Sequence, residues 1–400
     1  MGKLGCRMYQ GIMRAGMLFL PWRKPTMIIG ENTEEEMCQI LKEKNISTVL
    51  IVTDAGIVKL GLHNQIVKCL TARGINCIIY DKTVPNPTID NIEEGLKLYH
   101  ENKCTAIIAI GGGSPMDCAK GIGARVANPN KTISQMRGLL KVGKKLPPLF
   151  AVPTTAGTGS ETTLAAVITD GTTHEKYAIN DPNLIPHYAL LDAYYTKSLP
   201  PFLTATTGMD ALTHAVEAYI GQSNTKETRE SAEEAVRLIY HNLERAVEDG
   251  MHPTPRQNMQ KASFLAGVAF TRAYVGNIHS IAHTLGGQYG VAHGLANAII
   301  MPKVLKYYGS AIYDSIARLC DKAGLFQSCS SEREKTEAFI AWIEGLNKKF
   351  GIPEVVDKLK EVDIPLLARR AEKESNPLYP VPVIFSLEDF ENIYKQMLVK

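Results

Sequence analysis

Two side chains near the middle of the chain have the type and spacing of metal ligands. Asp210 and His214 lie four residues apart in the segment 208–217, whose pattern predicts a helix. Residues at i and i+4 share one helix face, so the carboxylate and the imidazole can reach a common point. The pair supplies half of a candidate site for a divalent ion.

The other half comes from a second predicted helix. His279 and His283 repeat the i,i+4 spacing, and His293 follows after a pair of glycines, where a third imidazole can return to the same point. Imidazole and carboxylate donors suit zinc or ferrous iron, and without thiolates a soft-metal or cluster site is not expected. Any one histidine could instead satisfy a buried hydrogen bond, but the combination predicts a metal site.

A glycine-rich turn suggests a second binding function. The apolar run 106–110 leads directly into Gly111–Gly113, and Ser114 suits the N-cap of a following helix, with Asp117 as its acidic partner. Glycines let the backbone approach a ligand, and the free N–H groups of a helix start favour an anion such as pyrophosphate. The alternative is a tight turn without a ligand.

A second turn and an acidic residue strengthen the nucleotide interpretation. Residues 153–161 are rich in glycine and hydroxyls and follow the next predicted strand, and Asp54 ends the first predicted strand. Such positions meet at the carboxyl ends of parallel strands, where open α/β sheets bind ligands. Asp54 could accept ribose hydroxyls and repel a 2′-phosphate, which predicts NAD over NADP. The order is not that of the GxGxxG fingerprint, because the acidic residue precedes the glycines.

These candidate residues require two kinds of scaffold, and the chain is long enough for both. Four hundred residues exceed the size at which one core keeps growing. Residues 1–197 alternate short apolar runs with helical patterns, which predicts a Rossmann-like domain with a mostly parallel sheet. Residues 198–400 show helical patterns alone, which predicts an all-helical, metal-binding domain. The predicted fold class is therefore α/β plus all-α.

Composition excludes some functions and suggests a compartment. The net charge is only +3, and no basic run is interleaved with aromatics, so nucleic acid is not an expected partner. Eight cysteines are scattered singly with no CxxC pair. Reduced thiols fit this pattern better than disulfides do, which predicts a cytoplasmic protein.

The N-terminal segment is the one part of the sequence whose pattern could indicate contact with a membrane. Residues 8–22 are fairly apolar, but Arg14 interrupts them and no small-residue cleavage site follows. We expect a helix docked on the body of the protein, with membrane attachment as the weaker alternative. No apolar run approaches a transmembrane length, and a membrane is not an expected partner.

Four motifs in fixed order carry a family resemblance. GGGSPMDCAK, PTTAGTGSE, GMDALTHAVEAY and HSIAHTLGGQYGVAHG resemble the iron-containing (group III) alcohol dehydrogenases, and the likeness runs from about Pro25 onward. The resemblance implies a dinucleotide-binding α/β domain, an all-helical domain and an active site in the cleft between them. One departure is Ala292, where family members usually have proline before the last ligand. That change loosens the turn and leaves His293 in place.

The resemblance also assigns residues. It implies that the metal ligands are Asp210, His214, His279 and His293. His283 is then a nearby histidine that does not bind the metal, and it could relay a proton or only hold a neighbour by a hydrogen bond. The residues expected to line the NAD site are Asp54, Gly111, Gly112, Gly113, Ser114, Asp117, Thr154, Thr155, Thr158 and Lys176.

The expected activity is hydride transfer between NAD(H) and a small primary alcohol or its aldehyde. The family favours Fe²⁺, although Zn²⁺ fits the same donors. The expected partners are the substrate and further copies of the chain, as a homodimer or higher homo-oligomer. Three alternatives remain open: a dehydroquinate-synthase-like lyase, which needs a basic pocket, a glycerol-dehydrogenase-like polyol enzyme, and a nucleotide-binding module without catalysis.

Overall fold

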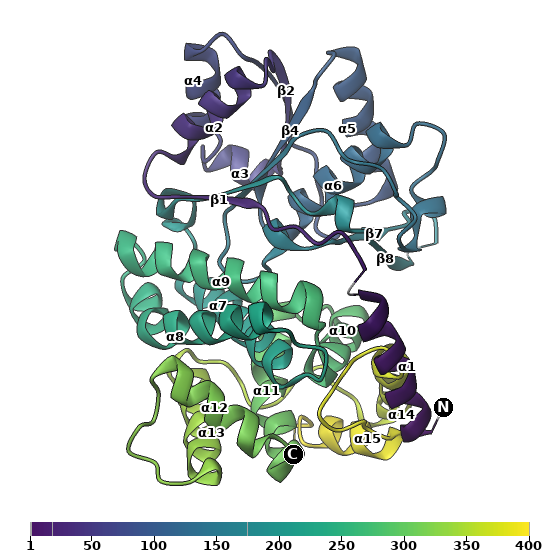
Figure 1. Cartoon of the computed structure of the whole chain (residues 1–400), viewed down its shortest axis with the longest axis vertical. Coiled ribbons are helices and arrows are strands. Elements are labelled where there is room, and N and C mark those ends of the chain that lie inside the picture. Colours follow the sequence, from purple (N-terminus) through teal and green to yellow (C-terminus); the bar gives the residue numbers. More distant parts are fainter. Residues whose placement is uncertain (1, 18, 174, 400) are drawn as a thin grey trace. The chain divides into compact units, whose positions relative to one another are not determined.

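The computed structural model of the chain describes residues 2–17, 19–173 and 175–399 (Figure 1). These residues form two compact units, an α/β unit and a helical unit. The α/β unit comprises Pro21–Leu199 and Met251–Gln260. The helical unit comprises Met1–Leu20, Pro200–Gly250 and Lys261–Lys400.

The two units differ from the predicted domains 1–197 and 198–400 in two segments. The first twenty residues belong to the helical unit, and the short segment 251–260 belongs to the α/β unit. That segment opens the long helix α9 (Pro253–Ala273), whose first turns bond to the α/β unit. Arg256 donates to the Leu199 carbonyl at 3.0 Å, and Gln260 donates to the Pro153 carbonyl at 3.3 Å.

The α/β unit is built on a six-stranded sheet in the order β1-β9-β6-β4-β2-β3, and every pairing is parallel. The strands are β1 (Thr26–Ile29), β2 (Thr48–Val52), β3 (Asn76–Tyr80), β4 (Ala106–Gly111), β6 (Leu149–Pro153) and β9 (Tyr188–Leu191). The central strands are continuous apolar runs and are buried throughout. A parallel strand covered on both faces requires such a run, so the predicted α/β class is confirmed.

Helices cover both faces of this sheet and make two separate cores. The helices are α2 (Thr33–Glu43), α3 (Ala55–Lys59), α4 (Asn64–Ala72), α5 (Ile89–Glu101) and α6 (Gly113–Ala127). Side chains of α5 and α6 fill one core, and side chains of α2 and α4 fill the other. A small second sheet follows the order β5 (Gly138–Leu139), β8 (Lys176–Asn180), β7 (Ala165–Thr169).

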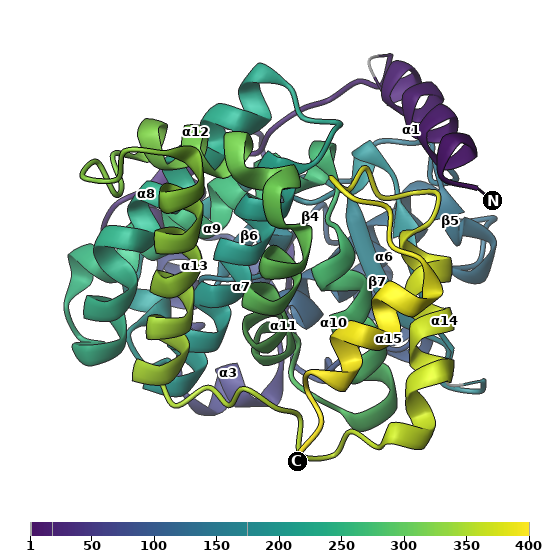
Figure 2. The ribbon, with the colours of Figure 1, turned by 90° about the horizontal axis from the view of Figure 1, so that it is seen from below.

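The helical unit surrounds one buried helix, α7 (Pro201–Ile220), which is buried on all sides from Gly208 to Ile220 (Figure 2). Most residues of this stretch are small or apolar, as expected of a helix in a core, and the buried Asp210, His214 and Glu217 are exceptions. The other helices are α1 (Lys3–Met17), α8 (Lys226–Glu248), α9, α10 (Asn277–Tyr289), α11 (His293–Tyr308), α12 (Tyr313–Ala323), α13 (Glu332–Lys349), α14 (Ile364–Ser375) and α15 (Leu387–Lys395). The described part of the chain contains no helix with the length and apolar character needed to cross a bilayer.

Short 3-10 helices complete the connections of both units. They span Ser134–Met136, Ser160–Thr162, Pro182–Leu184, Ala193–Thr196, Gly309–Ile312 and Glu361–Asp363. The one at Ser160–Thr162 belongs to the second glycine-rich turn of the sequence, so this turn has regular local structure.

Candidate metal and cofactor sites

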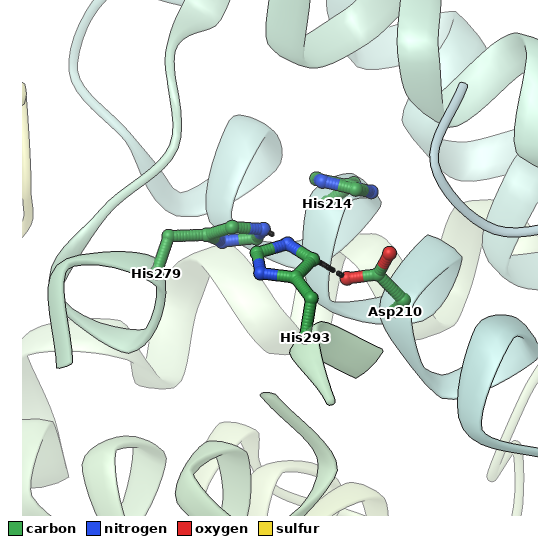
Figure 3. Close-up of side chains that lie close together, drawn as sticks. All are labelled: Asp210, His214, His279 and His293. Atoms are coloured by element: carbon green, nitrogen blue, oxygen red, sulfur yellow. Dashed lines mark ion pairs between the residues drawn. The ribbon is translucent and has the colours of Figure 1, made fainter. Parts of the chain in front are cut away.

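The four candidate metal ligands converge in the helical unit (Figure 3). Asp210 and His214 come from α7, His279 from α10, and His293 is the first residue of α11. One ligand atom from each lies within 4.8 Å of the others. Asp210, His214 and His279 are buried, whereas the side chain of His293 is 40% exposed. The cluster is therefore closed on three sides and accessible beside His293.

A close helix approach brings His293 to the cluster. A Cβ atom on Gly294 would lie 2.4 Å from the Thr206 carbonyl oxygen of α7, so only glycine fits at this position. The start of α11 can thus touch the backbone of α7. Nε2 of His293 lies 3.4 Å from Oδ1 of Asp210 as a result.

A buried carboxylate fixes the orientation of His279. Oε2 of Glu217 lies 2.6 Å from Nδ1 of His279, and the backbone N–H groups of Gly276 and Ile278 donate to the same carboxylate at 2.8 Å. A Cβ atom on Gly276 would lie 2.7 Å from the carboxylate, so the glycine admits it. Two backbone donors favour the ionised carboxylate, which leaves the imidazole proton on Nδ1. The Nε2 lone pair of His279 then faces the cluster.

The electrostatics of this pair favour a neutral imidazole. Burial lowers the pKa of His279 well below its usual value, and neighbouring imidazoles add to this effect. Burial also raises the pKa of Glu217 to about 8, and the backbone N–H groups oppose this shift. A cation held by the cluster would oppose it further, so the ionised carboxylate that keeps the proton on Nδ1 belongs to the metal-bound form. A neutral histidine with a free Nε2 is the form that binds a metal ion, so the donor set fits a divalent cation.

Asn297 contacts three of the ligand candidates with one nitrogen atom. Nδ2 of Asn297, one turn after His293 on α11, lies 2.7 Å from Oδ1 of Asp210 and 3.2 Å from Nε2 of both His279 and His293. One amide N–H₂ group cannot satisfy three acceptors, because it carries only two donors. A cation held by Asp210, His279 and His293 would satisfy the acceptors that the amide leaves without a donor.

His283 lies beside the cluster on α10. Its ring stacks on that of His293 with a centroid distance of 5.2 Å. Its Nδ1 lies 2.6 Å from Oε1 of Glu374, which also accepts a hydrogen bond from the Tyr379 hydroxyl at 2.8 Å. The side chain is 43% exposed. His283 thus has a carboxylate partner at Nδ1, and its ring lies at the exposed side of the cluster, next to His293.

In the α/β unit, the two glycine-rich turns lie side by side. Gly111 pairs with Pro153 at the ends of β4 and β6, and the Thr154 N–H donates to the Gly111 carbonyl at 3.0 Å. A Cβ atom on Gly112 would lie 3.5 Å from the Thr155 side chain, and one on Gly113 would lie 3.8 Å from that of Thr158. Backbone and hydroxyl groups of both turns therefore share one surface.

The prediction that Ser114 caps α6 was wrong. The helix begins two residues earlier, at Gly113, with Gly112 as its N-cap and no side-chain capping bond. The Ser114 hydroxyl instead accepts a hydrogen bond from the Asn86 N–H at 3.1 Å. A glycine cap leaves the first N–H groups of α6 without a side-chain competitor, which suits a bound anion better than a serine cap does.

Asp117 was also wrongly predicted as the capping partner. Its Oδ1 accepts from the Ser160 hydroxyl and its Oδ2 from the Val167 N–H, both at 3.1 Å. Fully buried Lys120, one turn further along α6, donates to Ser160, to Thr163 at 2.7 Å and to the Ala165 carbonyl at 2.8 Å. These side chains tie α6 to the second turn, because they bond across to it and not back to the helix start.

Asp54 follows β2 and caps α3, since its Oδ1 accepts from the Ile57 N–H at 3.0 Å. The Thr53 hydroxyl donates to the Ile110 carbonyl at 2.8 Å and joins the ends of β2 and β4. The strand order reverses between these two strands, because β3 lies on one side of β2 and β4 on the other. Asp54 and the first glycine turn thus flank a topological switch point, where such sheets bind ligands. Lys176 lies apart from them in the small sheet, exposed at the start of β8.

Comparisons with known proteins identify the family of the chain. The family described as "Iron-containing alcohol dehydrogenase" matches residues 25–193, and "Fe-containing alcohol dehydrogenase family, C-terminal" matches residues 204–398. The chain belongs to the iron-containing alcohol dehydrogenase family.

Individual relatives cover most of the chain. Alcohol dehydrogenase 4 of Schizosaccharomyces pombe is 39% identical over 88% of this chain and 84% of its own. The NAD-dependent methanol dehydrogenase of Bacillus methanolicus is 36% identical over 95% of this chain and 99% of its own. The crystal structure of a 1,3-propanediol oxidoreductase superposes with a TM-score of 0.90 at 34% identity, over 95% of this chain and 100% of that one.

Membership of the iron-containing alcohol dehydrogenases confirms several predictions. The chain is an oxidoreductase that interconverts alcohols and aldehydes with NAD and a metal ion. This class favours the dehydrogenase over the lyase and over a module without catalysis. The fold of an α/β unit followed by a helical unit is confirmed as well.

Three residues at the metal cluster escaped the sequence analysis, and two of them left a signal. Glu217 lies seven residues after Asp210 on α7, and Asn297 lies four residues after His293 on α11, so both share a helix face with a ligand candidate. Glu374 left no such signal, because it lies 91 residues from the histidine it contacts.

Proposed function

We propose that this iron-containing alcohol dehydrogenase reduces small aldehydes and oxidises the corresponding primary alcohols, with NAD(H) as the hydride carrier. The observation that carries the proposal is the convergence of a carboxylate and three imidazoles on one point. The proposed ligands are Asp210, His214, His279 and His293. We propose Fe²⁺ as the ion because of the family, although Zn²⁺ suits the same donors.

The chemistry at the cluster divides between the ion and the protein. When bound, a divalent ion in such a site acts as a Lewis acid on a substrate oxygen. Glu217 keeps the proton of His279 on Nδ1, so that Nε2 stays available as a donor. The exposed flank beside His293 leaves room for a small substrate, since the other three ligand candidates are buried.

We propose that His283 moves the proton between the substrate oxygen and solvent. Glu374 accepts from its Nδ1, which leaves Nε2 as the atom that exchanges a proton with the substrate. The ring is close enough to His293 to reach a group bound there, and it is exposed enough to return the proton to water. Its partner Glu374 stabilises the imidazolium that forms in one direction of the reaction.

For the cofactor we propose NAD bound at the switch point of the sheet. The uncapped N–H groups of α6 would hold the pyrophosphate, and the Asp54 oxygen not used for capping would hold the ribose. The proposed lining is Asp54, Gly111, Gly112, Gly113, Ser114, Asp117, Thr154, Thr155, Thr158 and Lys176. A relative that is NAD-dependent supports this choice over NADP.

The proposed substrates are primary alcohols of a few carbons. Relatives that cover most of the chain are a methanol dehydrogenase and a 1,3-propanediol oxidoreductase, whose substrates carry the hydroxyl on a terminal carbon. The remaining alternative is a polyol enzyme of the glycerol-dehydrogenase kind. It would prefer a substrate with neighbouring hydroxyls.

A substrate screen on protein of known metal content tests these proposals together. Oxidation of NADH is measured with a series of aldehydes and ketones, from formaldehyde to hydroxyacetone, after loading with Fe²⁺ or Zn²⁺. We expect turnover with short unbranched aldehydes. Preference for hydroxyacetone would favour the polyol enzyme, and metal-loaded protein that never oxidises NADH would favour a module without catalysis.

We also propose a cytoplasmic location and a homodimer or higher homo-oligomer. All eight cysteines are free thiols, which a reducing compartment would preserve. Light scattering on the purified protein measures the oligomeric state directly, and fractionation of cells measures the location.

A further inference from the structure

The N-terminal helix α1 is docked on one loop of the helical unit, as expected from the sequence. The loop comprises residues 377–382, between α14 and α15, and is called the docking loop below. Arg7 donates to the carbonyls of Val381 and Pro382 at 2.7 and 2.8 Å. The polar side of α1 therefore faces the backbone of this loop.

Gln10 makes a second, buried contact with the docking loop. Its Nε2 donates to the carbonyls of Tyr379 at 2.7 Å and Pro377 at 3.1 Å. Arg7 donates to its Oε1 at 2.9 Å, which fixes the direction of the amide. The side chain is only 6% exposed, so a movement of the loop would leave buried polar groups without partners. Gln10 thus holds the backbone of Tyr379 in place.

Apolar packing around Cys6 adds to these bonds. Cys6 is completely buried and belongs to a small core with Tyr379, Val381 and Ile384. The helix and the docking loop therefore share a core as well as hydrogen bonds. A change in α1 should be felt first at the residues of this loop.

The side chain of Tyr379 extends from the docking loop to the partner of His283. Its hydroxyl donates to Oε1 of Glu374 at 2.8 Å, and the same oxygen lies 2.6 Å from Nδ1 of His283. Burial and the neighbouring carboxylate raise the pKa of Tyr379 well above its usual value, so the hydroxyl keeps its proton and stays a donor. Because the tyrosine and the histidine share one oxygen, the position of the hydroxyl affects where the carboxylate meets the imidazole.

We propose that Gln10 is a positioning residue for the proton transfer by His283 and acts through Tyr379 and Glu374. The inference rests on the proposed role of His283. A general acid or base must lie within hydrogen-bond reach of the group it serves, so a small displacement of the imidazole slows the transfer. The family match begins at residue 25, so α1 contributes to the site from outside the matched residues.

The opposite side of α1 supplies a matched control. Leu4, Met8 and Ile12 repeat every four residues, so they share one face as an apolar stripe, and they are 78%, 63% and 70% exposed. Ile12→Ser changes the same helix on the side away from the docking loop. It should leave the rate of turnover unchanged.

Kinetics of the full, metal-loaded chain with NADH and a short aldehyde test the proposal. Gln10→Met keeps the length of the side chain and removes its hydrogen bonds, so we expect kcat to fall by about tenfold, with KM and metal content unchanged. Tyr379→Phe removes only the hydroxyl and should give a loss of similar size. The solvent deuterium isotope effect on kcat should rise in both variants and stay unchanged in Ile12→Ser, because proton transfer becomes the slow step.

A second background separates positioning from general damage. His283→Ala already lacks the imidazole, so adding Gln10→Met should slow turnover no further. An unchanged kcat and isotope effect in Gln10→Met would overturn the proposal. A further tenfold loss in the His283→Ala background would overturn it too, because Gln10 would then act elsewhere. Both results leave the role of His283 intact, whereas full activity of His283→Ala alone would overturn that role and this inference with it.

Discussion

The two units of this protein present their ligands to a binding partner in different ways. In the helical unit the ligand candidates are side chains, and each comes from a helix whose position is set by a glycine contact or a buried carboxylate. In the α/β unit the groups available to a ligand are mostly backbone N–H groups and hydroxyls of two turns. Asp117 and Lys120 hold the second turn by hydrogen bonds. In a site made of side chains, a single substitution removes a ligand, so binding and activity should be lost. In a site made of backbone groups, a single substitution should reduce binding only in part.

The largest expected effect comes from removing a ligand candidate. His214→Ala, His279→Ala or His293→Ala should abolish turnover and weaken metal binding by more than about 100-fold, since loss of a group that only supports a ligand already costs about 10- to 100-fold. Metal content is measured by mass spectrometry and by competition with a chelator. His100→Ala, on the exposed side of α5, is the control. Full metal occupancy in all three variants would show that these histidines are not metal ligands.

His283 separates proton transfer from metal binding within the same unit. His283→Ala should keep the metal and slow the chemical step by about 10²- to 10⁴-fold, the usual contribution of a general acid or base. Glu374→Gln should give a smaller loss of the same kind, because it removes the charge beside Nδ1 and not the imidazole. Single-turnover kinetics and metal analysis distinguish the two steps. Loss of metal from His283→Ala would make this residue a ligand.

Glu217 should affect the metal more than the rate. Glu217→Gln keeps the size of the side chain but presents an amide N–H₂ toward His279 or the backbone donors, so the tautomer of His279 is no longer enforced. We expect metal affinity to fall by about 10- to 100-fold. Saturating metal should restore most of the turnover. An unchanged chelator competition curve would show that Glu217 only fills space.

In the α/β unit, Lys120→Met should destabilise the contact between α6 and the second glycine-rich turn, and it should not change the metal content of the helical unit. Three acceptors lose their charged donor, and we expect the free energy of unfolding to fall by about 3 kcal/mol, since a hydrogen bond to a charged group contributes about 1.5–3 kcal/mol. Burial lowers the pKa of Lys120 from 10.5 to about 8.

This shift also predicts a pH dependence. Between pH 8 and 10.5 the unfolded chain binds more protons than the folded one, so this group makes stability rise with pH across that window. Urea unfolding at several pH values should show the rise in the unmodified chain and lose it in Lys120→Met. NADH affinity should fall by only about tenfold, because the backbone donors remain. Loss of the metal would contradict the separation of the two sites.

The smallest effect is expected at Asp54. Asp54→Gly removes the repulsion of a 2′-phosphate and should raise NADP use relative to NAD by about tenfold, as one hydrogen bond and one charge change. It also removes the cap of α3, which costs about 1 kcal/mol of stability. Asp54→Asn keeps a capping oxygen and removes the charge. A change in cofactor preference in both variants supports the cofactor role, and an unchanged preference in both would leave Asp54 with the cap alone.

The sequence predicted the parts of this protein that depend on local periodicity. The i,i+4 spacing paired Asp210 with His214, the position after two glycines indicated His293, and the apolar runs identified the buried parallel strands. The roles of these residues as ligands and as cofactor contacts stay predictions. Period and spacing determine which residues share a face, because helix and strand geometry is the same in every protein.

Only the tertiary structure decided what each face meets. Asp117 has the spacing of a capping partner, yet it bonds to Ser160 and Val167 of another segment. Glu374 meets His283 across 91 residues, a pairing that no local pattern encodes. The pattern of α1 is that of an ordinary amphipathic helix, but the carbonyls of Val381 and Pro382 hold its polar side and leave the apolar stripe outside. Which partner a face finds depends on the packing of distant segments, and this packing decides where charges and lone pairs are satisfied.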